Sequence, residues 1–107
     1  MISSGRRDTL IAFERASVSE NEDGDEIQDW AEIGKEWAAV NWGRGDERRQ
    51  AAMERAEQPA TFTVLDNELT RSLTTSNRIQ ADGIWDITST VPGKTRGERD
   101  ITAIRSA

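Results

Sequence analysis

The segment at residues 77–91, NRIQADGIWDITSTV, most constrains the fold, because it has the pattern of two β-strands joined at Asp82-Gly83. An Asp-Gly pair between β-type runs is a strong hairpin signal, since tight hairpin turns need residues that tolerate positive φ. Residues 60–65, ATFTVL, alternate between polar and apolar side chains, which indicates a further half-buried strand. Strands joined by tight turns pair antiparallel, so the sequence favours an antiparallel sheet.

Further runs of β-forming residues extend this pattern along the chain. Trp30, Ile33 and Trp37 have helical spacing, but Gly34 disfavours a helix by about 1 kcal/mol, so we expect a short turn before the second strand. Strands do not alternate with helices along the sequence, so a parallel sheet is not expected. The sequence predicts an all-β fold, a small antiparallel β-barrel or sandwich. Six strands are expected, near residues 8–15, 36–42, 60–66, 77–81, 84–91 and 100–105.

A chain of 107 residues suits one domain with one core, so we expect residues 1–107 to form a single domain. The chain contains four Trp residues. Each Trp ring buries on the order of 150–250 Å², so these side chains should supply much of the buried area. The residues expected in the core are Trp37 or Ala38, Val40, Phe62, Val64, Ile79, Trp85, Ile87, and Ile101 or Ile104.

Two segments between the expected strands are poor in apolar residues. Residues 19–26, SENEDGDE, hold five acids and should form an exposed acidic turn or mobile loop. Residues 43–58 form a long insertion between strands 2 and 3, rich in helix formers after Asp46 and ended by Pro59. Its apolar stripe is narrow, so we expect a partly helical loop that orders against a neighbouring protein.

The insertion also carries the candidate interaction residues. Its arginines alternate with acids, which suits a helix that makes ion pairs at the rim of a protein interface. Contact with phosphates through these arginines is the alternative, but the balanced charge favours a protein partner. The candidate residues are Arg44, Asp46, Glu47, Arg48, Arg49, Met53 and Arg55.

No catalytic, cofactor-binding or metal-binding set is expected. The chain has no Cys and no His, which removes thiol nucleophiles and the usual zinc ligands. Residues 20–26 lack the spacing of a calcium-binding loop, and residues 43–45 lack the Lys-Ser/Thr of a phosphate-binding loop. We therefore expect no enzyme activity and no cofactor. A hydrolase that uses paired Asp and Glu is the enzymatic alternative, but no spacing suggests such a pair.

The charge distribution argues against a nucleic-acid-binding protein. The net charge is −6, and residues 1–42 hold four basic and ten acidic residues. An acidic protein should not hold nucleic acid by counterion release. A small-barrel nucleic-acid-binding module, or another protein-interaction module, is the alternative function to be tested. No apolar run approaches the roughly 18 residues of a membrane span, and the first residues lack the apolar core of a secretory signal.

The order of several short motifs resembles the bacteriophage head–tail joining family, whose members act as head-closure, or stopper, proteins. The resemblance covers roughly residues 6–107 and is carried by DWAEIGKEWAAVNWGRGDE and NRIQADGIWDI. The Asn41-Trp42 pair departs from the more polar or Pro-containing strand end of the family. The positions that match are Arg7, Gly24, Trp30-Ala31, Gly34, Trp37-Ala38 with Val40, Gly45 with Glu47, Arg78-Ile79, and Trp85 with Ile87.

The resemblance implies a six-stranded barrel that forms a homo-oligomeric ring at the head–tail junction of a phage or phage-derived particle. Its expected partners are copies of itself, the portal-proximal connector or adaptor protein, and the tail or tail-terminator protein. Packaged double-stranded DNA would pass through the ring without sequence-specific binding. The resemblance places the protein in the virion neck, assembled in the bacterial host cytoplasm, with no membrane contact.

Overall fold

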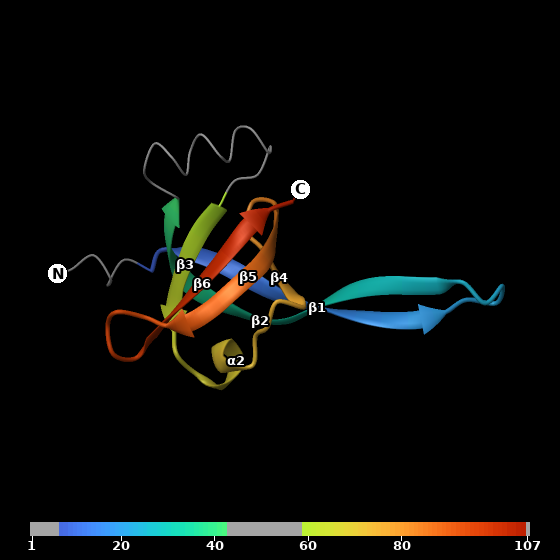
Figure 1. Cartoon of the computed structure of the whole chain (residues 1–107), viewed down its shortest axis with the longest axis horizontal. Coiled ribbons are helices and arrows are strands. Elements are labelled where there is room, and N and C mark those ends of the chain that lie inside the picture. Colours follow the sequence, from blue (N-terminus) through green and yellow to red (C-terminus); the bar gives the residue numbers. More distant parts are fainter. Residues whose placement is uncertain (1–6, 43–58, 107) are drawn as a thin grey trace.

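Six antiparallel strands close into a barrel with the strand order β1-β2-β3-β6-β5-β4, as the all-β prediction requires (Figure 1). The computed structural model describes residues 7–42 and 59–106. One short helix, α2 (Glu68–Arg71), accompanies the strands. The strands are β1 (Thr9–Glu20), β2 (Glu26–Trp42), β3 (Pro59–Leu65), β4 (Asn77–Gln80), β5 (Ile84–Pro92) and β6 (Glu98–Arg105).

The predicted hairpin at Asp82-Gly83 is confirmed. It joins β4 to β5, and both turn residues have positive φ, 50° at Asp82 and 131° at Gly83. The Ala81 amide donates to the Gly83 carbonyl oxygen at 2.9 Å. This turn sets the register in which Ile79 stands opposite Trp85, so that both side chains enter the barrel.

The barrel closes because β1 pairs with strands on both of its sides. Along residues 12–15, β1 pairs with β4, and in the same stretch it also pairs with β2. Closure removes the unpaired sheet edges that would otherwise be open to other chains. β1 and β2 continue past this stretch as a two-stranded hairpin that leaves the barrel (Figure 1).

The prediction of a short turn up to Gly34 is wrong, because β2 is one strand from Glu26 to Trp42. A β-bulge explains the misleading spacing. Phe13 pairs with Gly34 and Glu14 with Glu32, so Ile33 is an extra residue on β2. One extra residue shifts the alternation of side chains, which places Trp30 and Trp37 on the same outer face although they are an odd number of residues apart.

The first strand is also longer than expected, because it continues past residue 15 to Glu20. Its continuation pairs residue by residue with the first part of β2. The predicted acidic loop at residues 19–26 is therefore shorter than expected. Its end residues belong to strands, and only residues 21–25 form the turn.

The helix α2 was not predicted, and it packs against one end of the barrel (Figure 1). Its N-cap residue Asn67 accepts a hydrogen bond from the Thr70 amide, and the Thr70 hydroxyl accepts one from the Asn67 amide, each at 2.9 Å. This capping box stabilises a single helical turn. Leu69 of the helix packs on the core beside Gly34, where a Cβ atom would meet the Leu69 Cδ2 atom at 2.5 Å.

The core lies inside the barrel and largely follows the predicted alternation. Ala38 is buried, whereas Trp37 is 52% exposed, and Ile101 rather than Ile104 enters the core. Val40 is partly buried against the same cluster. Phe13 is fully buried but was missing from the prediction. The core residues are Ile11, Phe13, Ala38, Ala60, Phe62, Val64, Leu73, Ile79, Trp85, Ile87, Ile101 and Ala103.

Trp85 is the largest buried side chain, and its polar atom is satisfied. Its ring centroid lies 5.4 Å from that of Phe62, in an edge-to-face arrangement, and 5.5 Å from that of Trp42. The indole N–H donates to the Ala81 carbonyl oxygen at 3.1 Å. The ring therefore fills the core and also fixes the β4–β5 turn.

We expect Trp85→Ala to lower the free energy of unfolding by about 3–5 kcal/mol, because it removes a fully buried ring and leaves a cavity. Denaturant unfolding followed by circular dichroism measures this loss. Trp37→Ala is the matched control, and its exposed ring should change stability by less than about 1 kcal/mol. A loss below about 1 kcal/mol for Trp85→Ala would contradict the packing described here.

Candidate interaction surfaces

The most prominent surface feature is the hairpin that extends from the barrel, which we call the arm (residues 16–30) (Figure 1). β1 and β2 pair with each other along the arm. Among the described strands, none pairs with the outer edge of β1 beyond Arg15 or with the outer edge of β2 before Ala39. An isolated two-stranded hairpin is at best marginally stable in water. The arm is therefore a two-stranded hairpin whose outer edges are not covered by the described strands.

The tip of the arm is ordered by one asparagine. The Asn21 side-chain oxygen accepts hydrogen bonds from the amides of Asp23 and Asp25, both at 2.9 Å. The Gly24 amide donates to the Asn21 carbonyl oxygen at 3.0 Å, and Gly24 has a φ of 83°. These bonds form a defined five-residue turn, so the sharp reversal does not depend on a partner.

The arm is strongly acidic and exposed. Its acids lie mainly in the turn and at the strand ends beside it, and residues 16–30 include no Lys or Arg. None of the ion pairs between described side chains involves an acid of the arm. The acids of the arm are Glu20, Glu22, Asp23, Asp25, Glu26 and Asp29.

The base of the arm is held to the barrel by a three-residue contact between Glu14, Arg78 and Trp30. The Arg78 Nε–H group of β4 donates to the Glu14 Oε1 atom at 2.6 Å. The Arg78 guanidinium carbon lies 4.1 Å from the centroid of the Trp30 ring, in cation–π contact. Glu14 and Arg78 are largely buried, with 12% and 23% of their side chains exposed. Such charge-assisted and cation–π contacts orient the arm on the barrel.

A second surface lies on the outer wall of the barrel, and we call it the apolar row (Leu10, Trp37 and Leu65). Leu10 and Trp37 stand opposite each other in the β1–β2 ladder and are 47% and 52% exposed. Thr63 pairs with Ala39, so Leu65, two residues further along β3, stands level with Trp37 on the same face. Leu65 is 43% exposed. Three large apolar side chains thus form a strip across three strands.

The sequence-predicted interaction residues lie outside the described residues. All seven, from Arg44 to Arg55, belong to the insertion between β2 and β3, which the structure does not describe. Sequence reasoning missed both surfaces found here. The acidic run at residues 19–26 was the available signal for the arm tip. The apolar row depends on cross-strand register and has no contiguous signal.

Within residues 7–42 and 59–106, no three or more carboxylates come together in a way that could hold a metal ion. No helix in these ranges has the length and apolarity to cross a membrane. No buried polar side-chain atom in the described part of the chain lacks a hydrogen-bond partner.

Comparisons with known proteins give one family match and two structures with a similar fold. A family model described as phage head completion protein matches residues 2–106. A solution structure of a protein from Shigella flexneri 2a has a TM-score of 0.73 at 17% identity, and the match covers 99% of this chain and 98% of that chain. A chain from the virion of a native gene transfer agent particle has a TM-score of 0.60 at 19% identity, with 90% and 91% covered. No curated protein matches the sequence.

We expect Arg78→Ala to loosen the arm, because the substitution removes both the hydrogen bond to Glu14 and the cation–π contact with the Trp30 ring. The two contacts together contribute on the order of 1–2 kcal/mol. Amide hydrogen exchange in residues 16–20 and 26–30 should therefore become about 5- to 30-fold faster. Arg71→Ala is the control, because it removes a partly exposed ion pair in which the Arg71 Nε atom lies 3.3 Å from the Asp66 Oδ1 atom. Equal exchange in the two variants would show that Arg78 does not hold the arm.

Proposed function

Because this chain belongs to the phage head completion protein family, a family of structural virion proteins, we propose that it forms a ring at the head–tail junction. In that ring it joins the connector to the tail and closes the DNA channel. The observation that carries the proposal is the family match, which spans residues 2–106 and so includes the barrel and the arm.

The structure supports an assembly role in two ways. The arm and the apolar row are exposed, and none of their residues belongs to the core cluster inside the barrel. Exposed apolar strips and unpaired hairpins are typical of surfaces that meet other proteins. The proposed partners are copies of this chain, the portal-proximal connector or adaptor protein, and the tail or tail-terminator protein.

The proposed contact with DNA is passive. Acidic side chains dominate the first part of the chain, and an acidic channel wall lets DNA slide without binding it. The described ion pairs engage four of the seven described arginines, namely Arg7, Arg71, Arg78 and Arg99. We infer that packaged double-stranded DNA passes the ring without sequence-specific contacts, and that the protein acts without catalysis or a cofactor.

The proposal locates the protein in the neck of a phage or phage-derived particle, assembled in the cytoplasm of the host. Removing its gene should therefore leave complete tails and heads that do not join, with packaged DNA leaking from the heads. Electron microscopy and a nuclease-protection assay measure these two outcomes, and the gene supplied in trans is the control. Normal, DNA-retaining particles made without the gene would refute the proposed function.

The insertion at residues 43–58 is proposed to lie at one of these interfaces. A variant in which residues 46–57 are replaced by a short Gly turn should remain folded, because loop-closure entropy changes only slowly with length. It should fail to restore head–tail joining when supplied in trans. Joined, DNA-retaining particles made with this variant would show that the insertion is dispensable.

A small-barrel nucleic-acid-binding module is the alternative. Such modules place aromatic rings along a basic groove. Here the Trp85 ring is buried and the Trp30 ring is covered by Arg78. Two Trp rings are exposed, but Trp37 stands opposite Leu10 in the apolar row and Trp42 packs against Trp85. We expect no electrophoretic shift of duplex or single-stranded DNA at micromolar protein, and a shift that weakens with salt would favour the alternative.

A further inference from the structure

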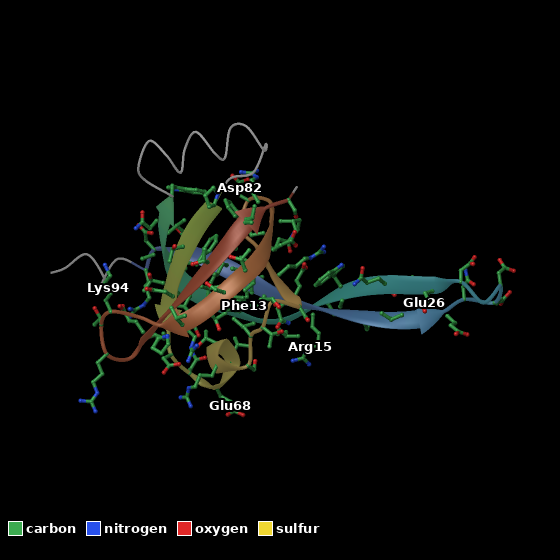
Figure 2. All side chains as sticks on the ribbon, in the orientation of Figure 1. Phe13, Arg15, Glu26, Glu68, Asp82 and Lys94 are labelled. Carbon is green, nitrogen blue, oxygen red and sulfur yellow. The ribbon has the colours of Figure 1, made fainter. Side chains whose placement is uncertain are left out.

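Opposite charges lie at opposite ends of the molecule. The arm with Glu26 extends to one end of the longest axis, and the β5–β6 loop with Lys94 lies at the other (Figure 2). The longest extent is 55 Å. Lys94 and Arg96 of this loop are exposed, and no ion pair between described side chains includes them. One end is therefore acidic and the other carries uncompensated positive charge.

Two acids next to the basic loop are already in ion pairs. Asp66 accepts from Arg99 at 3.1 Å, and Glu98 is buried against Arg7. The positive charge of Lys94 and Arg96 is consequently not cancelled by these neighbours. Charge at a site without local compensation attracts a complementary surface from another molecule.

The basic loop adjoins the apolar row. The Asp66 amide, next to Leu65, donates to the Gly97 carbonyl oxygen at 2.9 Å. Leu65 also stands opposite Glu98 in the β3–β6 ladder. The apolar row and the basic loop are therefore neighbours, and we call them together the receptor face (Leu10, Trp37, Leu65, Lys94 and Arg96).

The arm carries the complementary order of side chains on one of its faces. Ala16 stands opposite Trp30, Val18 opposite Gln28, and Glu20 opposite Glu26, so these residues share one face. Val18 is 62% exposed. Toward the tip, the apolar Val18 on this face is followed by the acidic pair Glu20 and Glu26. The receptor face changes from apolar residues to a pair of cations in the same way.

Two arms cannot supply this partner for each other. Directly opposed like charges destabilise strand pairs, and charged side chains along an edge discourage strand addition. Both edges of the arm approach a tip whose charged residues are all acids. Among the surfaces of this chain, this leaves the barrel of another copy to complement the arm.

We propose that the arm of one copy lies across the receptor face of the next copy, with Val18 on Leu65 and Trp37 and with Glu20 and Glu26 beside Lys94 and Arg96. This inference rests on the proposed ring and names the contact that builds it. The two surfaces differ, so the contact is head-to-tail, and repeated head-to-tail contacts close into a ring when the rotation permits.

Because the chain has no Cys, a designed cysteine pair reports this contact directly. We would make particles that carry Val18→Cys together with Leu65→Cys, oxidise them and separate the chains under denaturing conditions. The expected result is a ladder of multimers of this chain that collapses to monomer on reduction. Each single substitution should give no ladder beyond a dimer. Val18→Cys with Asp82→Cys, at the exposed β4–β5 turn away from the receptor face, should give none.

The outcomes separate this contact from the proposed function. DNA-retaining, tailed particles that contain the paired variant but yield no ladder would overturn the arm contact and leave the ring proposal standing. A cross-link only to a different virion protein would also overturn it, since the arm would then dock on that protein. Absence of the chain from particles would refute the proposed function itself.

Charge reversal gives an independent test with exposed residues. Glu20→Lys with Glu26→Lys, and separately Lys94→Glu with Arg96→Glu, should each lower the yield of DNA-retaining particles about tenfold or more. All four substitutions together should restore most of the yield, because the charges again complement each other. Circular dichroism controls for folding. If the fourfold variant is no better than either double variant, the proposed pairing is wrong.

Discussion

Residues 12–15 of β1 pair with two strands at once, and both the barrel and the arm depend on this short stretch. On one side they pair with β4, which closes the barrel, and on the other with β2. β4 is only four residues long, so β1 and β2 lose contact with the barrel where β4 begins at Asn77. The Asn77 side chain is itself tied in place, because its Nδ2 atom donates to the Glu14 carbonyl oxygen at 3.2 Å. The point at which the barrel ends is therefore the point at which the arm begins.

The sequence was sufficient for the parts of the fold that local patterns determine. Period-two alternation located β3, β5 and β6, and Asp82-Gly83 located the turn before β5. The sequence was insufficient where pairing with a strand distant in the chain determines the local structure. Trp30, Ile33 and Trp37 have helical spacing only because a bulge at Ile33 shifts the alternation in a strand. The bulge is a property of the β1–β2 pairing, so neither strand alone reveals it.

The candidate surfaces illustrate the same limit. Charge composition identified an exposed acidic segment at residues 19–26, which became the tip of the arm. The contact of Glu14 with Arg78 joins residues 64 positions apart, and only the β1–β4 register brings them together. Leu10, Trp37 and Leu65 resemble ordinary strand residues in the sequence. Their outward direction follows from which neighbours fill the barrel, and that depends on closure.

The regular ladder of the arm has a consequence for its reach. Each strand residue advances about 3.3 Å, and successive side chains alternate between faces. Inserting two residues into each strand of the arm would lengthen it by about 7 Å and keep every side chain on its present face. A one-residue insertion in each strand would instead turn the tip over. The length of the arm can thus change in steps of two residues per strand, while the barrel and its core stay the same.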